Sequence, residues 1–219
     1  MCIRDSNLPL AAIVLVFIVV GCSSGPAAPN ATSYIESIVE KRLEKDQFFR
    51  ESSSESPVPA NQQDEFLPLN YFPVNPALRV PAAIRIADKH RIFEMPTSTG
   101  TLREMRQVGT LEFMLKGQTM TLGAFVDANQ SALELLFVPF SDLTTGTETY
   151  EAGRYLDIER TATGIYVVDF NEAYSPYCAY NATYECPYPP ASNRLKVRIE
   201  AGERLKTLTP DTSGAEGAG

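Results

Sequence analysis

Apolar and polar residues alternate at every second position through several segments in the second half of the chain. Residues 110–115 place their apolar side chains on one face, and residues 118–126 repeat the pattern after Lys116 and Gly117. A glycine-containing two-residue turn between two alternating segments is typical of a β-hairpin with one buried face. Residues 110–126 are therefore predicted to form such a hairpin.

Further apolar segments predict the other strands. These segments are residues 77–87, 91–95, 132–140, 154–160, 165–170 and 194–202. A short turn, TATG, separates 154–160 from 165–170, so these two strands are expected to pair as a second hairpin. Residues 194–202 alternate apolar and charged side chains most regularly of all. Many short strands at regular spacing favour a mainly β fold, either an antiparallel, partly closed barrel or a sandwich.

One segment has the period of a helix. Residues 33–50 repeat apolar side chains at intervals of three and four, and Ser33 with Glu36 has the spacing of a capping box. The face that we expect to be buried consists of Ile35, Val39 and Leu43, with Ile38 beside them. The sequence thus adds one N-terminal amphipathic helix, packed on the β domain.

The N-terminal segment has the features of a lipoprotein signal peptide. Residues 10–20 form an uninterrupted apolar run of eleven. This is shorter than the about 20 residues that a membrane-spanning helix needs. The following tetrapeptide, VVGC, ends at Cys22 and resembles a lipobox, in which the cysteine receives acyl chains such as palmitate. Several acyl chains anchor a protein firmly, and residues 23–33 are small and polar, as a flexible tether should be.

These features predict a lipoprotein of the cell envelope that faces the periplasm or the exterior. Ser23, directly after Cys22, resembles bacterial lipoproteins of the outer membrane, if the organism has one. The first six residues, MCIRDS, resemble the translation of a transposase end used in sequencing libraries, and we expect them not to be native. The expected division is a signal peptide over 1–22, a tether over 23–33, a single β-rich domain over 34–205 and a disordered tail over 206–219.

Charge and composition narrow the chemistry. The net charge is −8, which argues against nucleic acid as a partner, because phosphate binding needs clustered Lys and Arg. The single histidine, His90, has no second histidine or nearby cysteine with which to share a metal ion, so no metal is expected. Neither GxGxxG nor a P-loop motif is present, and we expect no cofactor. A flavin-binding split barrel stays open as an alternative, because it needs only a few Arg, Ser and Thr contacts to phosphate.

Several segments together resemble a known family. They are residues 45–50 (KDQFFR), 66–74 (FLPLNYFPV), 95–113 (MPTSTGTLREMRQVGTLEF), 137–159 and 169–203. The resemblance is to the prokaryotic domain-of-unknown-function family 1684, and the last two segments are its most specific part. It implies that these two segments lie together in the fold, and it implies no catalytic residue.

Residues 170–190 contain two cysteines and five tyrosines. Cys178 and Cys186 are expected to form a disulfide outside the cytoplasm, worth about 2.6 kcal/mol in the chain-entropy model for a loop of about nine residues. The segment is then a stapled loop whose tyrosines cover a barrel mouth or the sheet face. The alternative is a stacking surface for a sugar or a peptide, formed by Tyr174, Tyr177, Tyr180, Tyr184 and Tyr188.

A second polar block, residues 141–155, follows a predicted buried strand. Polar, glycine-bearing loops in such positions commonly carry binding sites. The predicted pocket combines this block with the tyrosine segment and consists of Asp142, Thr145, Glu148, Thr149, Tyr150, Arg154, Tyr155, Asp169, Asn171, Tyr174 and Tyr177. In the alternative, Arg154 pairs with one of the acids and the threonines cap turns.

The leading hypothesis is an envelope lipoprotein whose β domain binds a small molecule, a glycan or an envelope protein. The rival hypothesis is an envelope hydrolase. It would act through a carboxylate and arginine pocket formed by Asp142, Glu148, Arg154 and Asp169, provided that these side chains converge. A purely structural role in the envelope is the third hypothesis. The sequence assigns no catalytic residue.

Overall fold

The computed structural model describes residues 30–52, 54–129, 135–159, 161 and 163–206, with the side chains of 88–90 excepted. The predicted signal peptide, the lipobox at Cys22, nearly all of the tether and the C-terminal tail beyond residue 206 lie outside these residues. No helix in the described part of the chain is both long enough and apolar enough to cross a membrane.

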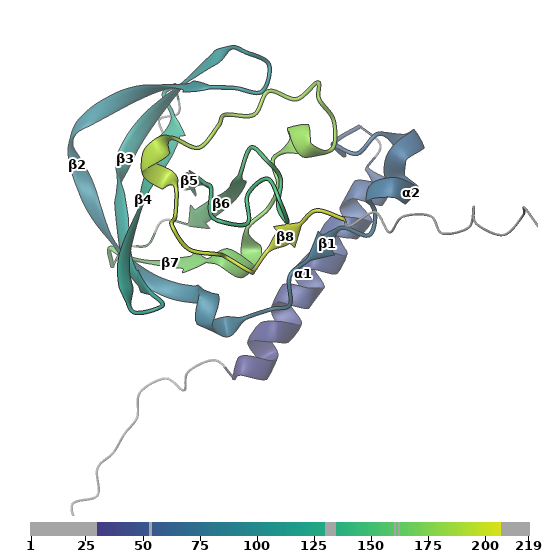
Figure 1. Cartoon of the computed structure of the whole chain (residues 1–219), viewed down its shortest axis with the longest axis horizontal. Coiled ribbons are helices and arrows are strands. Elements are labelled where there is room, and N and C mark those ends of the chain that lie inside the picture. The colour runs from purple at the N-terminus through teal and green to yellow at the C-terminus, as the bar shows by residue number, and fades with distance from the viewer. Residues whose placement is uncertain (1–29, 53, 130–134, 160, 162, 207–219) are drawn as a thin grey trace, which may run out of the picture.

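A six-stranded antiparallel sheet forms the body of the protein and curls into a nearly closed barrel (Figure 1). Its strands follow the order β6-β5-β4-β3-β2-β7. Their bounds are β2 Arg79–Pro96, β3 Leu102–Leu115, β4 Gln118–Asp127, β5 Leu135–Phe140, β6 Arg154–Glu159 and β7 Ile165–Asp169. The predicted fold class, a mainly β and partly closed antiparallel barrel with an N-terminal helix, is confirmed.

Smaller elements surround the barrel. Strand β1 (Asn70–Tyr71) pairs with β8 (Glu203–Arg204) in a separate two-stranded sheet. The helices are α1 Ala31–Glu51 and α2 Gln63–Phe66, with short 3₁₀ turns η1 Ala60–Gln62, η2 Pro76–Leu78, η3 Phe170–Glu172, η4 Tyr177–Ala179 and η5 Ala191–Asn193. In Figure 1 the yellow segment runs from η5, beside the barrel strands, to β8, beside β1 and α1.

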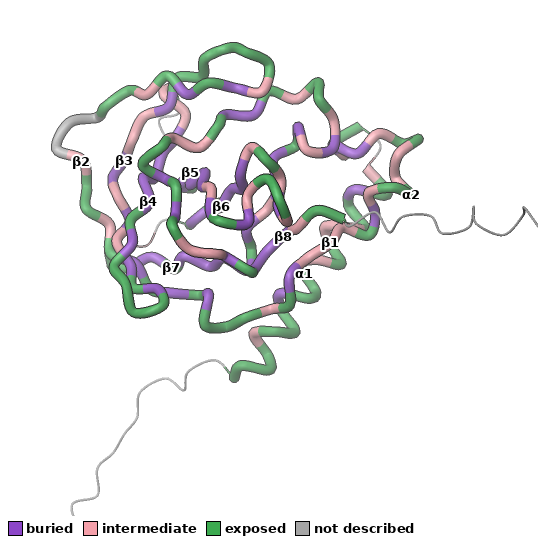
Figure 2. Tube along the Cα trace, in the orientation of Figure 1, coloured by how far each residue is buried: buried purple, intermediate pink, exposed green. Residues whose placement is uncertain are grey.

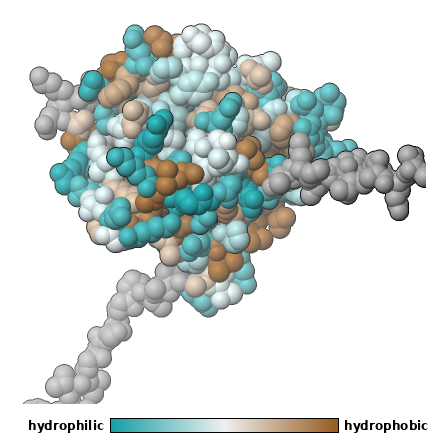
Figure 3. Space-filling model, in the orientation of Figure 1, coloured by the Kyte–Doolittle hydropathy of each residue, from teal (hydrophilic) through white to brown (hydrophobic). Residues whose placement is uncertain are grey.

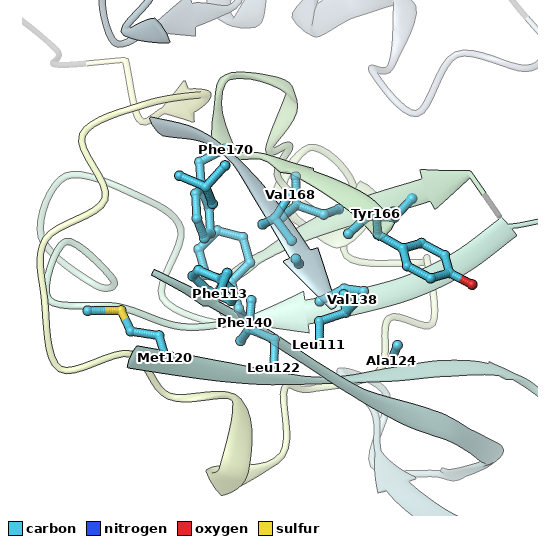
Figure 4. Close-up of a cluster of buried hydrophobic side chains, with 14 of the residues drawn as sticks. Leu111, Phe113, Met120, Leu122, Ala124, Val138, Phe140, Tyr166, Val168 and Phe170 are labelled. Atoms are coloured by element: carbon cyan, nitrogen blue, oxygen red, sulfur yellow. The ribbon is translucent and has the colours of Figure 1, made fainter. Parts of the chain in front are cut away.

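The barrel interior is filled with apolar side chains. Phe113, Phe140 and Phe170 meet at ring-centroid distances of 5.9 and 5.4 Å, and Leu111 and Val138 extend the same cluster (Figure 4). Figure 2 shows the buried positions concentrated along the barrel strands. The interior is therefore a packed core, and a ligand cavity has to lie elsewhere.

The predicted hairpin over residues 110–126 is confirmed, with Leu115 opposite Gln118 and a positive φ at both Lys116 (50°) and Gly117 (75°). The other strands near it are longer than predicted. The segments predicted as 77–87 and 91–95 form one strand, β2, whose register shifts between Ile86 and Arg91. Strand β3 begins eight residues before the predicted residue 110, because its polar first part pairs along the second half of β2.

The second predicted hairpin is wrong in its pairing. Strands β6 and β7 exist nearly as predicted, but β6 pairs with β5 and β7 pairs with β2. In the described residues no ladder joins β6 to β7, and they flank the open seam of the barrel. The alternating pattern correctly gave the buried face of each strand, whereas the curvature of the sheet decided the partner.

Residues 194–202, the most regular strand pattern in the sequence, do not form a strand. Leu195 and Ile199 are buried in the barrel core and Val197 packs against it, so the inward positions are as predicted. The backbone is tied instead to the loop after β5, where the N–H of Leu195 donates to the carbonyl of Ser141 (2.8 Å). The side chains of Asp142 and Arg154 form hydrogen bonds with the backbone of Ile199 in the same segment.

The helix α1 packs through a different face from the one predicted. Ile38 and Phe49 are buried, whereas Ile35, Val39 and Leu43 are 37%, 44% and 64% exposed. The helix crosses a polar rim, because the apolar side chains of the barrel are already packed inside it. Figure 3 shows hydrophilic residues interspersed with smaller hydrophobic areas over this face of the molecule.

Polar contacts fasten α1 to the barrel. The hydroxyl of Tyr34 donates to Asp169 (2.8 Å), and Arg42 donates to the carbonyl of Phe72 (3.1 Å). The predicted capping box is also wrong. The N-cap is Asn30, whose side chain accepts from the N–H of Thr32 (3.2 Å), because the helix starts two residues earlier than expected.

Candidate functional site

The tyrosine-rich segment lies across the outer face of the sheet. At one end, Tyr155 of β6 and Tyr174 exchange both backbone hydrogen bonds, at 2.8 and 3.0 Å. At the other end, Pro187 forms a bridge with Thr97, just beyond β2. Of the two positions predicted for this segment, a barrel mouth or the sheet face, the structure has the sheet face.

The period of the strands sets which side chains meet this segment. Leu156 and Ile158 of β6 point into the barrel core, so Tyr155 and Asp157 point outward. On the neighbouring strand β5, Phe137 is the register partner of Asp157 and shares its face. Two aromatic residues and one carboxylate thus stand side by side beneath the covering segment.

A cavity of about 500 Å³ separates the sheet from this segment. Such a volume is within the range of small-molecule sites in proteins. Its lining comes from α1, β3, β4, β5, β6 and the covering segment and consists of Lys45, Arg103, Met105, Val126, Asp127, Leu135, Phe137, Tyr155, Asp157, Tyr174, Pro176, Tyr177, Tyr184, Glu185, Cys186 and Pro187.

Aromatic rings form two walls of the cavity. In the first wall, Tyr155 meets Phe137 at 4.7 Å and Tyr174 at 5.8 Å between ring centroids, both edge to face. In the second, Tyr177 meets Tyr184 at 5.3 Å, also edge to face. The hydroxyl of Tyr155 is fixed as well, because it donates to the carbonyl of Pro187 (2.6 Å). These contacts hold the rings rigidly, which is favourable for stacking on a ligand.

Asp157 is the carboxylate of the first wall. The Asp157 side chain is partly exposed to solvent. Protein atoms nevertheless surround much of it, and this partial burial raises the pKa of its carboxyl above the ordinary value. The hydroxyl of Tyr174 donates to it (2.7 Å) and, together with the nearby ammonium of Lys45, partly offsets the rise in pKa. A carboxylate held in an environment that disfavours its charge is a common mark of a functional site.

Cys186 lies in the cavity wall beside Cys178. Both are buried free thiols here, and the N–H of Cys178 donates to the sulfur of Cys186 (3.1 Å). A hydrogen bond from the Cys186 thiol lowers the pKa of Cys178 to about 6, and the same contact raises the pKa of Cys186. The pair thus loses one proton easily and the second with difficulty. The disulfide stays a prediction, now between residues that are in contact.

The polar block 141–155 has a structural function. Arg154 is 0% exposed, donates to the carbonyls of Ile199 (2.8 Å) and Glu203 (3.2 Å), and pairs with Asp142 (3.4 Å). The Asp142 carboxylate accepts the N–H of Ile199 (2.6 Å) and the hydroxyl of Thr144 (2.8 Å). Burial lowers the pKa of Arg154, and Asp142 opposes this. This buried pair supplies the hydrogen bonds that a neighbouring strand would otherwise give to residues 199–201.

The rest of the predicted pocket is divided among other places. Thr145 donates to Asp142 (3.3 Å), and Thr149 exchanges a hydrogen bond with Thr144 (3.1 Å), as expected of turn-capping threonines. Glu148 pairs with Arg198 at the surface. Tyr150 packs beside Tyr155 and the two cysteines, next to the cavity.

Asp169 and Asn171 lie at α1, where the Asn171 side chain donates to the hydroxyl of Tyr34 (2.9 Å) and Asp169 accepts from the same hydroxyl. Of the eleven residues predicted to form one pocket, only Tyr155, Tyr174 and Tyr177 line the cavity. Asp142 and Arg154 form a buried pair, whereas Glu148 lies at the surface and Asp169 lies at α1. The four side chains do not form one pocket, so the hydrolase hypothesis loses its geometric basis.

Sequence reasoning missed several lining residues. The sequence offered a signal for Asp157, because this carboxylate follows Tyr155 by two residues and shares its outward face of the strand. Phe137 had a weaker one, since it sits in an apolar run with no alternation. Lys45 and Arg103 had none, because α1 and β3 reach the cavity only through the tertiary fold.

The fold and site together define a small antiparallel β-barrel protein with a packed interior and an aromatic cavity on the outside of its sheet. The chain belongs to the family described as protein of unknown function (DUF1684), whose model matches residues 64–204. The family resemblance is thereby confirmed.

A solved structure supports the same assignment. The chain is similar to an uncharacterized protein of Haloarcula marismortui, determined by solution NMR, at 37% identity and a TM-score of 0.64. The match covers 81% of this chain and 97% of that one. No curated protein matches the chain.

Proposed function

We propose that this chain is a lipid-anchored ligand-binding protein of the cell envelope, and that the cavity between the sheet and the tyrosine segment is its binding site. The envelope location rests on the apolar segment 10–20 and the lipobox at Cys22. The binding function rests on one observation above all, the aromatic cavity with Asp157 in its wall.

Two physical arguments support a binding function. The barrel core is packed without the cavity, so the open space between the sheet and the tyrosine segment is not needed to fill the interior. A recessed carboxylate with a raised pKa costs stability near neutral pH. Features that cost stability and serve no packing purpose are concentrated at binding sites.

The size of the cavity favours a small molecule or a single residue of a peptide or glycan over a folded partner. Aromatic rings at right angles suit a flat or compact ligand with an apolar face. The flavin alternative has less support, because the phosphate of a flavin nucleotide would lie close to Asp127, Asp157 and Glu185, three carboxylates of the lining.

A thermal-shift screen tests the binding function. The full chain, purified in non-ionic detergent, would be screened against sugars, peptidoglycan fragments, short peptides, small amines, flavins and metal ions. A ligand at about 100 times its Kd stabilises the folded state by about 2.7 kcal/mol. At about 2–4 °C per kcal/mol, the melting temperature Tm should rise by about 5–11 °C.

Variants then locate the site. Tyr177→Ala and Tyr184→Ala should reduce the shift caused by a hit, whereas Tyr188→Ala should not. Tyr188 is a matched control, because it belongs to the same segment and is as exposed as Tyr177 but does not line the cavity. A hit whose shift survives both lining variants binds elsewhere, and a silent screen would contradict a small-molecule function.

Lipid anchoring has its own test. Cells that express the protein should incorporate a labelled palmitate analogue into the wild-type chain and not into Cys22→Ser. The wild-type protein should fractionate with membranes, while the variant should not. Incorporation of label that is equal in the two chains would contradict the anchor assigned to Cys22.

A further inference from the structure

We infer that the cavity binds an organic cation, a small molecule whose ammonium group is carried on apolar or hydroxylated carbon. This inference rests on the proposed binding function and adds the chemical class of the ligand. It is carried by the balance of charge in the cavity wall and by the arrangement of the rings around it.

The charges of the lining leave an acidic excess. Arg103 pairs with Asp127 at 3.1 Å within the wall. The ammonium of Lys45 is bound to Glu203, outside the lining. Both cations of the lining are therefore already neutralised by carboxylates of the protein.

Two carboxylates of the lining have no ionic partner among the described residues. Asp157 accepts a hydrogen bond only from the neutral hydroxyl of Tyr174. Glu185 accepts from the hydroxyl of Thr101 (2.6 Å) and, more weakly, from that of Thr99 (3.4 Å). A cation that enters the cavity would meet one carboxylate without an ion pair on the sheet, whose charge Lys45 offsets only in part, and another on the covering segment, whereas an anion would be repelled.

The rings strengthen this preference. Tyrosine and phenylalanine faces attract ammonium groups through the ring quadrupole. The protein itself uses this interaction at the cavity wall, where the Lys45 ammonium lies 5.0 Å from the ring centroid of Tyr174. Tyr155, Tyr177 and Tyr184 offer further rings around the space next to Asp157.

A neutral sugar is the competing ligand class. It could stack on the same rings and donate a hydroxyl to Asp157. It could also donate a hydroxyl to Glu185, but it would leave the negative charge of both carboxylates uncompensated. The two classes differ in one measurable property, because only a cation should lose affinity when its charge is removed at constant shape.

The experiment compares cations with neutral molecules of the same shape. Binding of choline and cadaverine to the full chain in non-ionic detergent would be measured by titration calorimetry. The neutral partners are 3,3-dimethylbutan-1-ol for choline and 1,5-pentanediol for cadaverine, and glucose represents the sugars. At least one cation should bind about tenfold more tightly than its neutral partner, and higher salt should reduce its affinity.

One substitution identifies the carboxylate. Asp157→Asn keeps the size of the side chain and its ability to accept from Tyr174, so the fold should be retained. It should weaken cation binding about tenfold and leave the binding of neutral molecules unchanged. Asp64→Asn removes an exposed carboxylate on α2 that is not part of the lining, so it is the matched control and should have no effect.

Other outcomes overturn the inference in distinguishable ways. If neither cation binds more tightly than its neutral partner, the ligand is not a cation. Preferential binding of glucose would establish a sugar site and leave the proposed binding function intact. If nothing in the broader screen binds either, the binding function itself fails.

Discussion

The buried pair of Asp142 and Arg154 makes a strong prediction about stability. Asp142→Ala removes the one carboxylate that, among the described residues, is hydrogen-bonded to the fully buried guanidinium of Arg154. It also leaves the N–H of Ile199 without its acceptor and the hydroxyl of Thr144 with Thr149 as its remaining partner. Residues 199–201 belong to no strand of the described chain, so no ladder could replace these bonds.

The expected cost follows from this geometry. Removing one member of a buried ion pair destabilises a protein by about 3–5 kcal/mol, because the remaining charge is left buried and uncompensated. For a chain of this length, each kcal/mol lowers Tm by about 2–4 °C. A loss of about 4 kcal/mol therefore corresponds to a fall in Tm of about 8–16 °C.

The assay is thermal unfolding of the full chain in detergent, followed by circular dichroism and confirmed by urea unfolding. The control is Glu148→Ala, which removes a carboxylate from the same loop. Its partner Arg198 is at the surface, so solvent already screens the pair and Tm should change little. If the Tm of Asp142→Ala equals that of Glu148→Ala, this would refute the view that the buried pair replaces a strand neighbour.

Three further predictions concern the helix, the cavity and the cysteines. Ile38→Ala should lower the free energy of unfolding by about 2–5 kcal/mol, measured with urea, whereas Val39→Ala on the exposed face should lower it little. Asp157→Asn should raise Tm at pH 7, because burial raises the pKa of this carboxyl above its ordinary value of 3.8 and so makes its charged form destabilising. This gain in Tm should shrink as the pH falls and vanish below the ordinary pKa of the carboxyl. An unchanged Tm of Asp157→Asn at pH 7 would contradict the prediction. Protein isolated without reductant should show Cys178 blocked to alkylation in denaturant, and free thiol there would exclude the disulfide.

Other titratable groups lie around Asp157 and bear on this stability test. The titratable groups that face it are Tyr174 and Tyr177 from the covering segment and Lys45 from α1. The tyrosines stay protonated over the range tested, since burial raises the pKa of each. A change of Tm with pH that differs between wild type and Asp157→Asn therefore reports on the carboxyl.

The candidate site was only partly predictable. Tyr155, Tyr174 and Tyr177 were expected and do line the cavity. Tyr174 and Tyr177 belong to the tyrosine-rich segment 170–190, and Tyr155 ends the polar block 141–155. Arg154 and Asp142 were placed in the wrong category, because a buried ion pair and a binding pocket use the same residue types. Only burial separates the two, and burial of a loop residue depends on what covers it.

In the extended segments the sequence by itself determined which side chains point inward, whereas the buried face of α1 was predicted wrongly. The alternation in residues 110–126 and even in 194–202 correctly gave the buried positions, because the period of an extended chain is a local property. The mainly β class followed from the same local pattern. The tertiary structure alone decided which segments became neighbours.

Strands β6 and β7 found other partners, because closure of a curved sheet sets hydrogen-bond pairing over long separations. Residues 194–202 lost their place in a ladder to side chains of Asp142 and Arg154, which lie far away in sequence. The cavity arises in the same way, where α1, the sheet and the covering segment meet. Such contacts depend on the whole packed chain, and no local period encodes them.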